Sequence, residues 1–430
     1  MTSCIINSAS LRCILLSLYL LLVNRRCCSS FSIESRSWMY KDHQIGYEKA
    51  GRNHVVPDGH GSPKTKNTCT PILLLNGFGV GSFHQHRLMT ELLEIRYMEE
   101  KKTKSVTMGS KKGNEEMESL IYGIDYLGQG RSWPVNCDDG NSESELGLIY
   151  SVDTWADQII HFIEDVIAKD HDVTRDDGPM KIHLVGNSVG GYLSILLASR
   201  RPDLIDSVTL LNATPVWGLN LPGWSGHLPP PLIPRKIGRF LFDQIRNLNT
   251  IEKYLEAAYH NPLAFNSKLM EQIRGCTEGK GGHAAFASIL WSPPGSFPNG
   301  VSNVYDGLTM LECDVLLIFG KDDPWCTPAF AKRMLGSLRK RGIGLTSEKH
   351  VHRYIELENV GHCPNHEAPK AVGMIVNRWT QTLDRNKNSL PLLDGSKYRV
   401  KEKWGEVIIK EIDEDDAQMN LYEKVITTMV

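Results

Sequence analysis

Short apolar runs alternate with amphipathic segments along most of the chain. Six runs have the length of strands and are mostly apolar: residues 71–75, 121–125, 181–185, 207–211, 315–319 and 354–357. A continuous apolar run is typical of a strand that is covered on both faces. Between the second and third runs, residues 152–169 place Trp155, Ile159, Ile163 and Val166 on one side of a helix. This alternation predicts a mostly parallel sheet with helices on both faces.

Other segments interrupt the alternation. Residues 53–68 and 99–119 are polar and poor in apolar residues, and we expect them to be surface insertions. Residues 212–308 separate two strands by more than a crossover helix needs, and they are rich in Trp, Leu and Phe. This segment is predicted to be an inserted cap. Residues 386–430 are a charged tail, and a charge run of this kind typically covers a solvated face.

The amino-terminal residues predict a targeting leader. Residues 13–23 are a mostly apolar stretch behind Arg12, and Cys28 and Ser30 place small residues just before Phe31, as in a signal peptide with its cleavage site. The next residues are rich in Ser and Arg and poor in acids, as in transit peptides. A signal followed by a transit segment resembles the two-part leader of algae with secondary plastids, which indicates the chloroplast. Secretion and a membrane anchor are the alternatives.

Composition and charge narrow the classes of function. The 430 residues include 48 basic and 50 acidic side chains, and a net charge of -2 gives no electrostatic reason to expect a nucleic-acid partner. No apolar run reaches the roughly 18 residues of a membrane-spanning helix, which excludes a polytopic membrane protein. The 10 cysteines include no pair with CxxC spacing, which argues against a zinc site.

A Gly-x-Ser-x-Gly motif follows the third apolar run. Gly186, Ser188 and Gly190 lie between this strand and a helix-forming segment. A serine raised on such a sharp turn has a strained backbone, so the residues two before and two after it must be nearly without side chains. Backbone N–H groups at the start of the helix then favour developing negative charge. We therefore predict Ser188 to be a nucleophile; a structural serine in a Gly-rich turn is the alternative.

A serine that transfers acyl groups needs a base, and the base needs an orienting acid. With this elbow the order along the chain should be Ser, Asp or Glu, His, each after a later strand. Asp322 and Asp323 follow the strand at 315–319, and His362 follows the strand at 354–357. We predict His362 as the base and Asp323 as the acid, because in related sequences the residue before Pro-Trp faces the histidine. Histidines without such a placement are predicted to be surface or packing residues: His84, His86, His283 and His366.

An oxyanion hole needs two backbone N–H donors. One is expected from Val189, directly after the nucleophile, and the other from the loop after the first apolar run. This loop reads NGFGVG at residues 76–81, and Phe78 is the predicted donor because glycines flank it. A plain Gly-rich turn is the alternative, and a phosphate loop is excluded because no GK[ST] follows.

These features resemble the α/β-hydrolase superfamily over about residues 38–383. Several strings also resemble the pheophytinase group of plants and algae: GFGVGSFH at 77–84, DYLGQG at 125–130, GNSVGGY at 186–192, LLNATPVWG at 210–218, AFASIL at 285–290, DPW at 323–325 and GHCPNHEAP at 361–369. The elbow pattern and DPW are generic to the superfamily, whereas Asn187 and the strings at 210–218 and 361–369 are more specific to the group. The chain departs from the group at Asn76, in its two polar insertions and in its tail.

The resemblance implies a serine carboxylic-ester hydrolase that removes the phytyl chain from pheophytin, giving pheophorbide and phytol in chlorophyll breakdown. Ser188, His362 and Asp323 would form its triad. Trp217 and Trp224, in a mostly uncharged part of the cap, are expected to contact the substrate, since a macrocycle and its phytyl chain need a large apolar cleft. Packing of the cap against the core is the alternative for these residues.

The same resemblance indicates which ligands and partners to expect, and which other functions compete with ester hydrolysis. We expect no metal or organic cofactor, a hydrophobic ester as ligand, no nucleic acid and no obligate protein partner, and the chain suits peripheral association with a membrane. One alternative is an esterase acting on chlorophyll or a lipid ester, and another is a ligand-binding module on a hydrolase scaffold. Epoxide hydrolases and haloalkane dehalogenases need aspartate at the elbow, which argues against both.

The predicted organisation is thus one α/β-hydrolase enzyme with additions. It comprises a leader at 1–30, a core in two parts at 37–211 and 309–385, a cap at 212–308 and a charged tail at 386–430. The core alone then falls within the usual size of one domain.

Overall fold

The computed structural model describes residues 31–52, 69–106, 120–133, 150–171, 180–218, 232–278, 286, 289–340, 350–384, 393, 397–413 and 416–428. The predicted leader at 1–30, the polar insertion at 53–68 and Trp224 in the cap lie outside these residues. Within them, no helix combines the length and the apolar character needed to cross a membrane.

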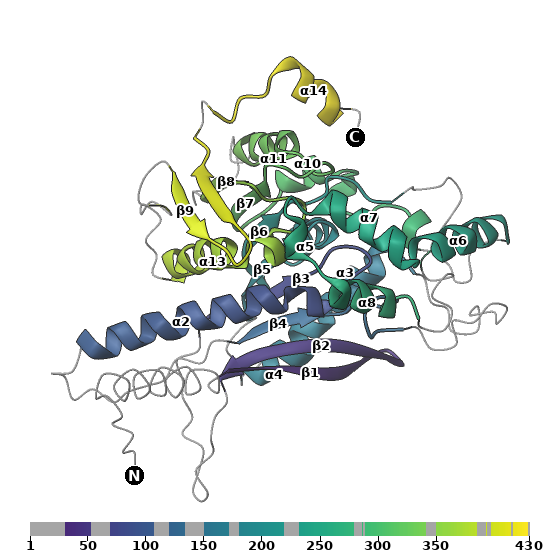
Figure 1. Ribbon diagram of the computed structural model, residues 1–430, viewed down its shortest axis with the longest axis horizontal. Coiled ribbons are helices and arrows are strands. Elements are labelled where there is room, and N and C mark those ends of the chain that lie inside the picture. The colour runs from purple at the N-terminus through teal and green to yellow at the C-terminus, as the bar shows by residue number, and fades with distance from the viewer. Residues whose placement is uncertain are drawn as a thin grey trace, which may run out of the picture.

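A single sheet of ten strands runs through the described part of the chain (Figure 1). Its order is β1-β2-β4-β3-β5-β6-β7-β8-β10-β9, and the six strands from β4 to β8 in this order are parallel. The strands are β1 (Phe31–Tyr40), β2 (His43–Arg52), β3 (Ile72–Leu75), β4 (Ile121–Ile124), β5 (Ile182–Asn187), β6 (Ile205–Leu211), β7 (Asp314–Gly320), β8 (His352–Glu358), β9 (Tyr398–Lys401) and β10 (Glu406–Glu411). All six predicted strands lie in the parallel part.

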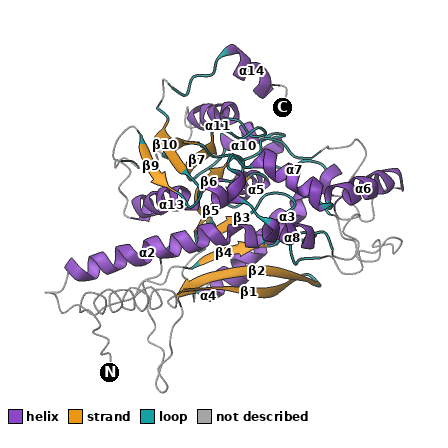
Figure 2. Cartoon of the chain, viewed as in Figure 1, coloured by secondary structure: helices purple, strands orange, loops and turns teal. Residues whose placement is uncertain are grey.

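Helices connect the parallel strands and cover the sheet (Figure 2). The longer ones are α2 (His86–Val106), α3 (Val152–Phe162), α5 (Val189–Arg200), α6 (Leu232–Ile245), α7 (Leu248–Ala258), α8 (Ser267–Gly275), α11 (Pro328–Lys340), α13 (Pro369–Asp384) and α14 (Leu421–Thr428). Shorter ones are η1 (Ser82–Gln85), the π-helical η3 (Ile163–Ile167), α4 (Ala168–Asp170), η5 (Pro262–Ala264), η6 (Pro298–Gly300), α10 (Val304–Leu308) and α12 (Pro364–Glu367). The helix predicted at 152–169 is thus present as α3, η3 and α4 in succession.

The parallel strands are buried on both faces, as their continuous apolar runs predict. On β3, Leu73 and Leu75 belong to one core cluster, which includes residues of α3, α5, α10 and α11. Ile72 and Leu74 belong to a second cluster, which includes residues of α2 and α13. Alternate side chains of a strand point to opposite faces, so the two helix groups cover opposite sides of the sheet. The predicted α/β fold is confirmed.

Helices α6, α7 and α8 lie between β6 and β7 in the segment predicted as a cap. Residues of α7 and α8 form a small cluster of their own, which includes Ile251, Leu255, Tyr259 and Leu269. The end of the segment differs, because Val304 and Leu308 of α10 belong to the main core cluster. The last part of the expected cap therefore packs with the sheet.

Two polar segments are more regular than their composition indicates. The prediction of a surface insertion at 99–119 is wrong at its start, because α2 continues to Val106. Oε2 of Glu99 also accepts a hydrogen bond from Nδ2 of Asn377 on α13 at 2.9 Å. In the charged tail, β10 pairs antiparallel with β8 and β9 pairs with β10. An edge strand and a surface helix expose polar side chains on one face. Their sequences are therefore less apolar, and they are harder to recognise from an apolar pattern.

Candidate functional site

Ser188 lies where β5 turns into α5. Its φ of 54° and ψ of −115° place it in the positive-φ region that side chains disfavour. The two flanking glycines have no room for a side chain. A Cβ on Gly186 would lie 2.2 Å from the carbonyl oxygen of Gly190, and a Cβ on Gly190 would lie 2.3 Å from that of Leu75. The backbone therefore has the strained elbow that the motif predicts, with Ser188 at the amino-terminal end of α5.

His362, on the loop after β8, contacts Asp323, on the loop after β7. Nδ1 of His362 lies 2.7 Å from Oδ2 of Asp323, and both side chains are buried. Because an ionised carboxylate only accepts hydrogen bonds, this contact places the imidazole proton on Nδ1 and leaves Nε2 as an acceptor. Asp322 points elsewhere, and its Oδ2 accepts from the backbone N–H of Asn359 at 2.9 Å. Asp323 is thus the aspartate that faces His362.

Asn212, which the sequence reading did not single out, orients the same carboxylate. Nδ2 of Asn212 donates to Oδ2 of Asp323 at 2.8 Å, while its Oδ1 accepts from the backbone N–H of Gly320 at 2.8 Å. The backbone N–H of Trp325 donates to Oδ1 of Asp323 at 2.8 Å. The carboxylate therefore accepts from three donors, which fix its direction. A polar residue directly after β6, next to β7 in the sheet, is the signal that could have revealed Asn212.

The backbone of His362 is held from two sides. Its N–H donates to the carbonyl oxygen of Ala258 at 2.7 Å. Its carbonyl oxygen accepts from Nδ2 of Asn187 at 2.9 Å, and this Nδ2 also donates to the carbonyl of Leu211 at 3.1 Å. Ala258 ends α7 in the cap and Asn187 precedes Ser188, so the cap and the elbow together position His362. Asn187 was recognised from the sequence as specific to the pheophytinase group, and its hydrogen bond to His362 gives a structural reason for an asparagine there.

The loop between β3 and η1 passes directly against Ser188. A Cβ on Gly77 would lie 3.4 Å from the Cβ of Ser188. Asn76 ties the loop to itself, because its Nδ2 donates to the carbonyl oxygens of Gly77 at 3.0 Å and Val80 at 2.9 Å. Phe78, the predicted oxyanion donor, lies between these two anchors. At Asn76, where the chain departs from the group, the side chain thus stabilises the conformation of the loop by two hydrogen bonds within it.

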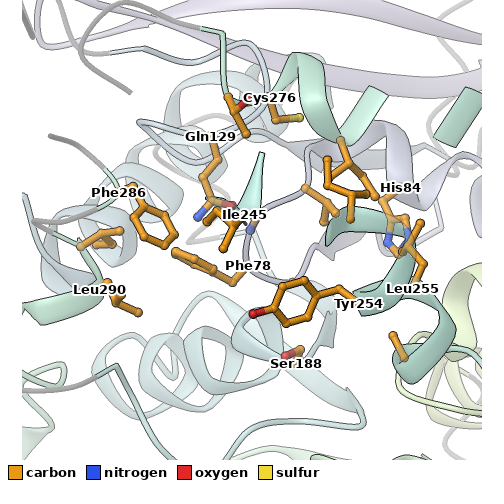
Figure 3. Close-up of a pocket in the computed structure, with 18 of the residues that line it drawn as sticks. Phe78, His84, Gln129, Ser188, Ile245, Tyr254, Leu255, Cys276, Phe286 and Leu290 are labelled. Carbon is orange, nitrogen blue, oxygen red and sulfur yellow. Dashed lines mark hydrogen bonds between the residues drawn. The ribbon is translucent and has the colours of Figure 1, made fainter. Parts of the chain in front are cut away.

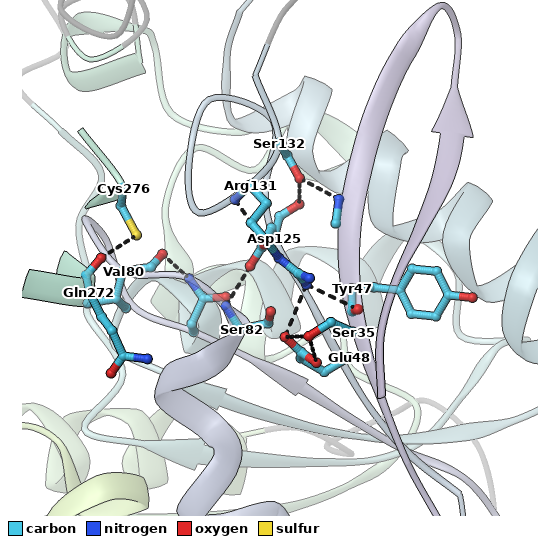
Figure 4. Close-up of polar contacts among 12 residues, drawn as sticks. Ser35, Tyr47, Glu48, Val80, Ser82, Asp125, Arg131, Ser132, Gln272 and Cys276 are labelled. Carbon is cyan, nitrogen blue, oxygen red and sulfur yellow. Dashed lines mark hydrogen bonds and ion pairs between the residues drawn. The ribbon is translucent and has the colours of Figure 1, made fainter. Parts of the chain in front are cut away.

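The turn after β4 supports the same loop from the other side (Figure 4). The backbone N–H of Gly79 donates to Oε1 of Gln129 at 3.0 Å, and that of Ser82 donates to Oδ1 of Asp125 at 2.6 Å. Oδ2 of the buried Asp125 accepts from both the backbone N–H and Nε of Arg131, at 3.0 and 3.1 Å. These contacts give the DYLGQG string a structural reason, since Asp125 and Gln129 fix the path of the glycine loop.

A cavity of about 600 Å³ opens beside Ser188 (Figure 3). Ser188, His362 and Phe78 lie on its wall. Most of the remaining lining is apolar and includes Leu241, Phe242, Ile245, Ile251, Tyr254, Leu255, Ala258, Ile273, Phe286, Ile289 and Leu290. Cavities of this size with few polar groups suit apolar small molecules, and the polar groups set the orientation.

A second cavity of about 250 Å³ meets the first at Ser188. Val189 and Trp217 line it, and Ser188, Phe78 and His362 are common to both cavities. Trp217 is largely buried, and its Nε1 donates to Oγ of Ser292 at 3.1 Å. Trp217 thus packs the segment and also borders the site, and its contact with a substrate stays a prediction.

His84 and His366, predicted to be surface or packing residues, are buried close to the site. Their rings stack with centroids 4.6 Å apart. The hydroxyl of Tyr259 lies 2.9 Å from Nε2 of His84 and 2.9 Å from Nδ1 of His366. Burial lowers the pKa of His84 to about 3 and moves the pKa of His366 in the same direction. Both rings are consequently neutral packing groups, although His84 also lines the larger cavity.

The turn of the β9–β10 hairpin contacts the loop that carries His362. Nε1 of Trp404 donates to the carbonyl oxygen of Glu367, and the guanidinium of Arg87 lies 4.4 Å from the centre of the Trp404 ring. Oε2 of Glu367 accepts from the backbone N–H of Gly361 at 2.8 Å, and its Oε1 accepts from that of Asn261 at 2.6 Å. The tail thus supports a glutamate that joins the cap to the residue before His362.

One group of residues in the described part of the chain has metal-ligand types close together. The ligand atoms of Asp323, Cys326 and His362 lie within 4.8 Å of one another. Metal binding would need a thiolate and a deprotonated imidazole nitrogen. Burial instead raises the pKa of Cys326, and Nδ1 of His362 carries the proton shared with Asp323. The chemistry of these donors therefore suits the hydrogen bond between His362 and Asp323 better than a metal site.

Comparison with known proteins agrees with this geometry. Residues 72–373 match the profile of the alpha/beta hydrolase family. The chloroplastic pheophytinase of Arabidopsis thaliana is 27% identical over 405 residues, which covers 84% of this chain and 69% of that protein.

Solved structures of hydrolases share the fold. A meta-cleavage product hydrolase from Pseudomonas fluorescens has a TM-score of 0.51 at 16% identity, covering 80% of this chain and 97% of its own. The epoxide hydrolase CorEH has a TM-score of 0.51 at 14% identity, covering 82% of this chain and 100% of its own.

Proposed function

The chain belongs to the alpha/beta hydrolase family, and on this premise we propose that it is a serine carboxylic-ester hydrolase. The observation that carries the proposal is the convergence of a strained serine and a histidine on one cavity wall, with the histidine oriented by a buried aspartate. Ser188 is the nucleophile, His362 the general base and Asp323 the orienting acid. Each role is one that acyl transfer requires.

The proposed mechanism follows from the proton on Nδ1 of His362. Nε2 takes the proton from Oγ of Ser188 as this oxygen attacks the ester carbonyl, and the backbone N–H groups of Phe78 and Val189 donate to the resulting oxyanion. Nε2 then returns the proton to the alcohol oxygen, the C–O bond breaks and the alcohol leaves. Water attacks the acyl-enzyme by the same steps, releasing the acid and restoring Ser188.

The substrate that we propose is pheophytin, with phytol and pheophorbide as products. The relative from Arabidopsis and the apolar lining of the larger cavity support this choice. The two cavities also meet at Ser188, so an ester lying across this residue can place its alcohol and acid parts on different sides. The chloroplastic location of the same relative supports a plastid location for this chain.

Of two other functions, the first fits the same site and the second fits it less well. An esterase for chlorophyll or a lipid ester would use the same triad and the same apolar cavity. A ligand-binding module would need the cavity but not the Asn212–Asp323–His362 chain of hydrogen bonds, which has a clear purpose only in catalysis.

A parallel assay tests the proposal. Purified protein and its Ser188→Ala variant are given pheophytin, chlorophyll and a short-chain acyl ester, and the products are separated by chromatography. We expect pheophorbide from pheophytin with the wild type and none with the variant. Turnover of the short ester alone would refute the pigment substrate, and turnover of none of the three would refute the ester hydrolase.

A further inference from the structure

Aromatic side chains from the core and the cap adjoin in the wall of the larger cavity. The ring centroid of Phe286 lies 5.7 Å from that of Phe78 and 5.5 Å from that of Phe242 on α6. All three residues line the larger cavity, and of the three only Phe78 also lines the smaller one. Aromatic rings favour offset-stacked and edge-to-face contacts with other flat conjugated rings. This wall therefore suits a flat ring system.

Gln129 places a buried hydrogen-bond donor on the wall of the same cavity. Its Oε1 accepts from the backbone N–H of Gly79 at 3.0 Å, and because an N–H only donates, the other end of the amide is the donor Nε2. Among the described residues Nε2 has no hydrogen-bond partner, and Gln129 is only 5% exposed. Figure 3 shows this amide directed toward the other side chains that line the cavity.

An unpaired buried donor lowers stability by about 1–3 kcal/mol, and it needs an explanation. An acceptor on a molecule that fills the cavity up to Gln129 would offset this cost. The larger cavity thus combines an aromatic wall with one unsatisfied donor, and Gln129 does not line the smaller cavity.

These two features distinguish the halves of the proposed substrate. The phytyl alcohol is a branched hydrocarbon, so it has no acceptor beyond its ester oxygen. The acid half is a flat conjugated macrocycle that carries a ring ketone and a methyl ester. Only the acid half offers both a flat ring to Phe242 and Phe286 and an acceptor to Nε2 of Gln129.

The smaller cavity suits the alcohol half. Its volume of about 250 Å³, against about 600 Å³ for the larger one, favours a flexible chain over a rigid macrocycle. Val216 lines this cavity and is 43% exposed, so a long chain can extend past it into solvent. The hydroxyl of Thr214, on the same wall, already donates to the carbonyl oxygen of Val216 at 3.1 Å, which leaves no unsatisfied donor there.

We propose that the larger cavity binds the acid half of the ester as a flat ring whose carbonyl oxygen accepts from Nε2 of Gln129, and that the smaller cavity binds the alcohol half. Gln129 is then a residue that determines specificity. The assignment of the two halves rests on the proposed ester hydrolysis, whereas binding of a ketone-bearing ring beside Gln129 does not.

Two isomeric esters test the orientation. Methyl fluorenylbutyrate carries a flat ring on its acid half, and fluorenylpropyl acetate carries the same ring and linker on its alcohol half. Dividing each rate by that of hydroxide-catalysed hydrolysis removes the difference in intrinsic reactivity. We expect kcat/KM of the wild type to be at least about tenfold higher for the methyl ester. Equal values, or a preference for the acetate, would overturn the orientation.

A ring ketone tests the donor. Methyl fluorenonylbutyrate differs from the fluorenyl ester by this ketone, and we expect the wild type to prefer it by about tenfold in kcat/KM. Gln129→Leu should abolish the preference, although it also frees the N–H of Gly79 and slows every ester. Gln129→Glu keeps an acceptor for Gly79, so it should lose the preference with a smaller loss of turnover. No preference in the wild type, or a preference that both variants retain, would overturn the role of Gln129.

Binding to the inactive Ser188→Ala protein separates this proposal from the proposed function. In this background Ile245→Trp fills the larger cavity, which Ile245 lines, and the control Ile233→Trp changes a side chain of α6 that is 71% exposed. Calorimetry with the fluorenonyl ester should show binding at least about tenfold weaker for Ile245→Trp only. Equal binding by the two variants would overturn the ring site. Binding that depends on Ile245 and Gln129, without hydrolysis of any ester by the wild type, would refute the ester hydrolase and leave the ring site standing.

Discussion

Nδ2 of Asn187 donates a hydrogen bond to the backbone carbonyl of His362 at 2.9 Å. The residue before the proposed nucleophile therefore holds the backbone of the proposed base. The same Nδ2 donates to the carbonyl of Leu211 at 3.1 Å, and Asn187 is buried. The contact couples the elbow to the histidine loop, so that the two reacting side chains share one rigid frame.

Removing this contact should reduce catalysis more than binding. Asn187→Leu keeps a similar volume and leaves the carbonyl of His362 without this donor, whereas the carbonyl of Leu211 keeps the backbone N–H of Ser188 at 3.0 Å. The loss should lower the free energy of unfolding by about 1–3 kcal/mol. We expect kcat for a short-chain ester to fall by about 10–100-fold, with little change in KM. Steady-state kinetics and urea unfolding measure both effects. A variant with wild-type kcat would mean that Asn187 does not position His362.

Adjacent aspartates provide a matched pair of variants. Asp323→Asn keeps the shape of the side chain but favours the wrong imidazole tautomer of His362, and we expect kcat to fall by about 10⁴-fold. Asp322→Asn changes a carboxylate that contacts Asn359 instead, and its kcat should stay within a few-fold of the wild type. Equal losses in the two variants would contradict the assignment of the acid.

Trp404 should matter to the active site although it lies in the carboxyl-terminal hairpin. Trp404→Ala removes the hydrogen bond to Glu367 and the contact with Arg87, and we expect it to lower both kcat and the free energy of unfolding, the latter by about 1–3 kcal/mol. Tyr398→Ala, on β9 of the same hairpin, is the control. If Tyr398→Ala lowers kcat to the same extent, the effect comes from the hairpin as a whole and not from Trp404.

The buried histidine pair predicts a pH dependence of stability. Burial lowers the pKa of His84 from its ordinary value of 6.5 to about 3, and lowers that of His366 as well. The unfolded chain takes up protons near pH 6.5 while the folded chain resists them, so stability is present above this pH and falls as the pH decreases. Each group contributes about 1.4 kcal/mol per pH unit.

Urea unfolding between pH 7 and pH 5 measures this dependence. His366→Gln keeps a polar side chain that does not titrate, and its stability should fall less steeply than that of the wild type. A steeper fall in the variant would contradict the neutral state of His366.

The parallel strands could be predicted because both faces of each are buried, so that every residue of a run such as Ile72–Leu75 is apolar. The hairpins at the edges of the sheet could not be predicted in this way. In β9 only Val400 is partly buried, and the exposed Tyr398, Arg399 and Lys401 leave no alternation of apolar and polar positions. The extension of α2 past Glu99 was missed for a related reason, since its contact with Asn377 joins residues far apart in the sequence.

The residues of the site also differ in whether they could be predicted from the sequence. Ser188, Asp323 and His362 follow from a local motif and from the order of loops after parallel strands. Asn212 and Ala258 act through carbonyl, amide and carboxylate groups that converge only in the folded chain, and no local pattern marks such convergence. His84 was predicted to be a surface or packing residue, and it is a buried packing residue against Tyr259 and His366. That it also borders the cavity could not be predicted from its place in the sequence.

Covalent labelling tests the central claim most directly. The protein is treated with a fluorophosphonate, which reacts with activated serines, and the adduct is located by mass spectrometry after cleavage behind Lys181 and Arg200. We predict one adduct per chain on the peptide 182–200, lost in Ser188→Ala and strongly slowed in Asp323→Asn. An unlabelled wild type, or equal labelling of Ser188→Ala, would contradict an activated Ser188.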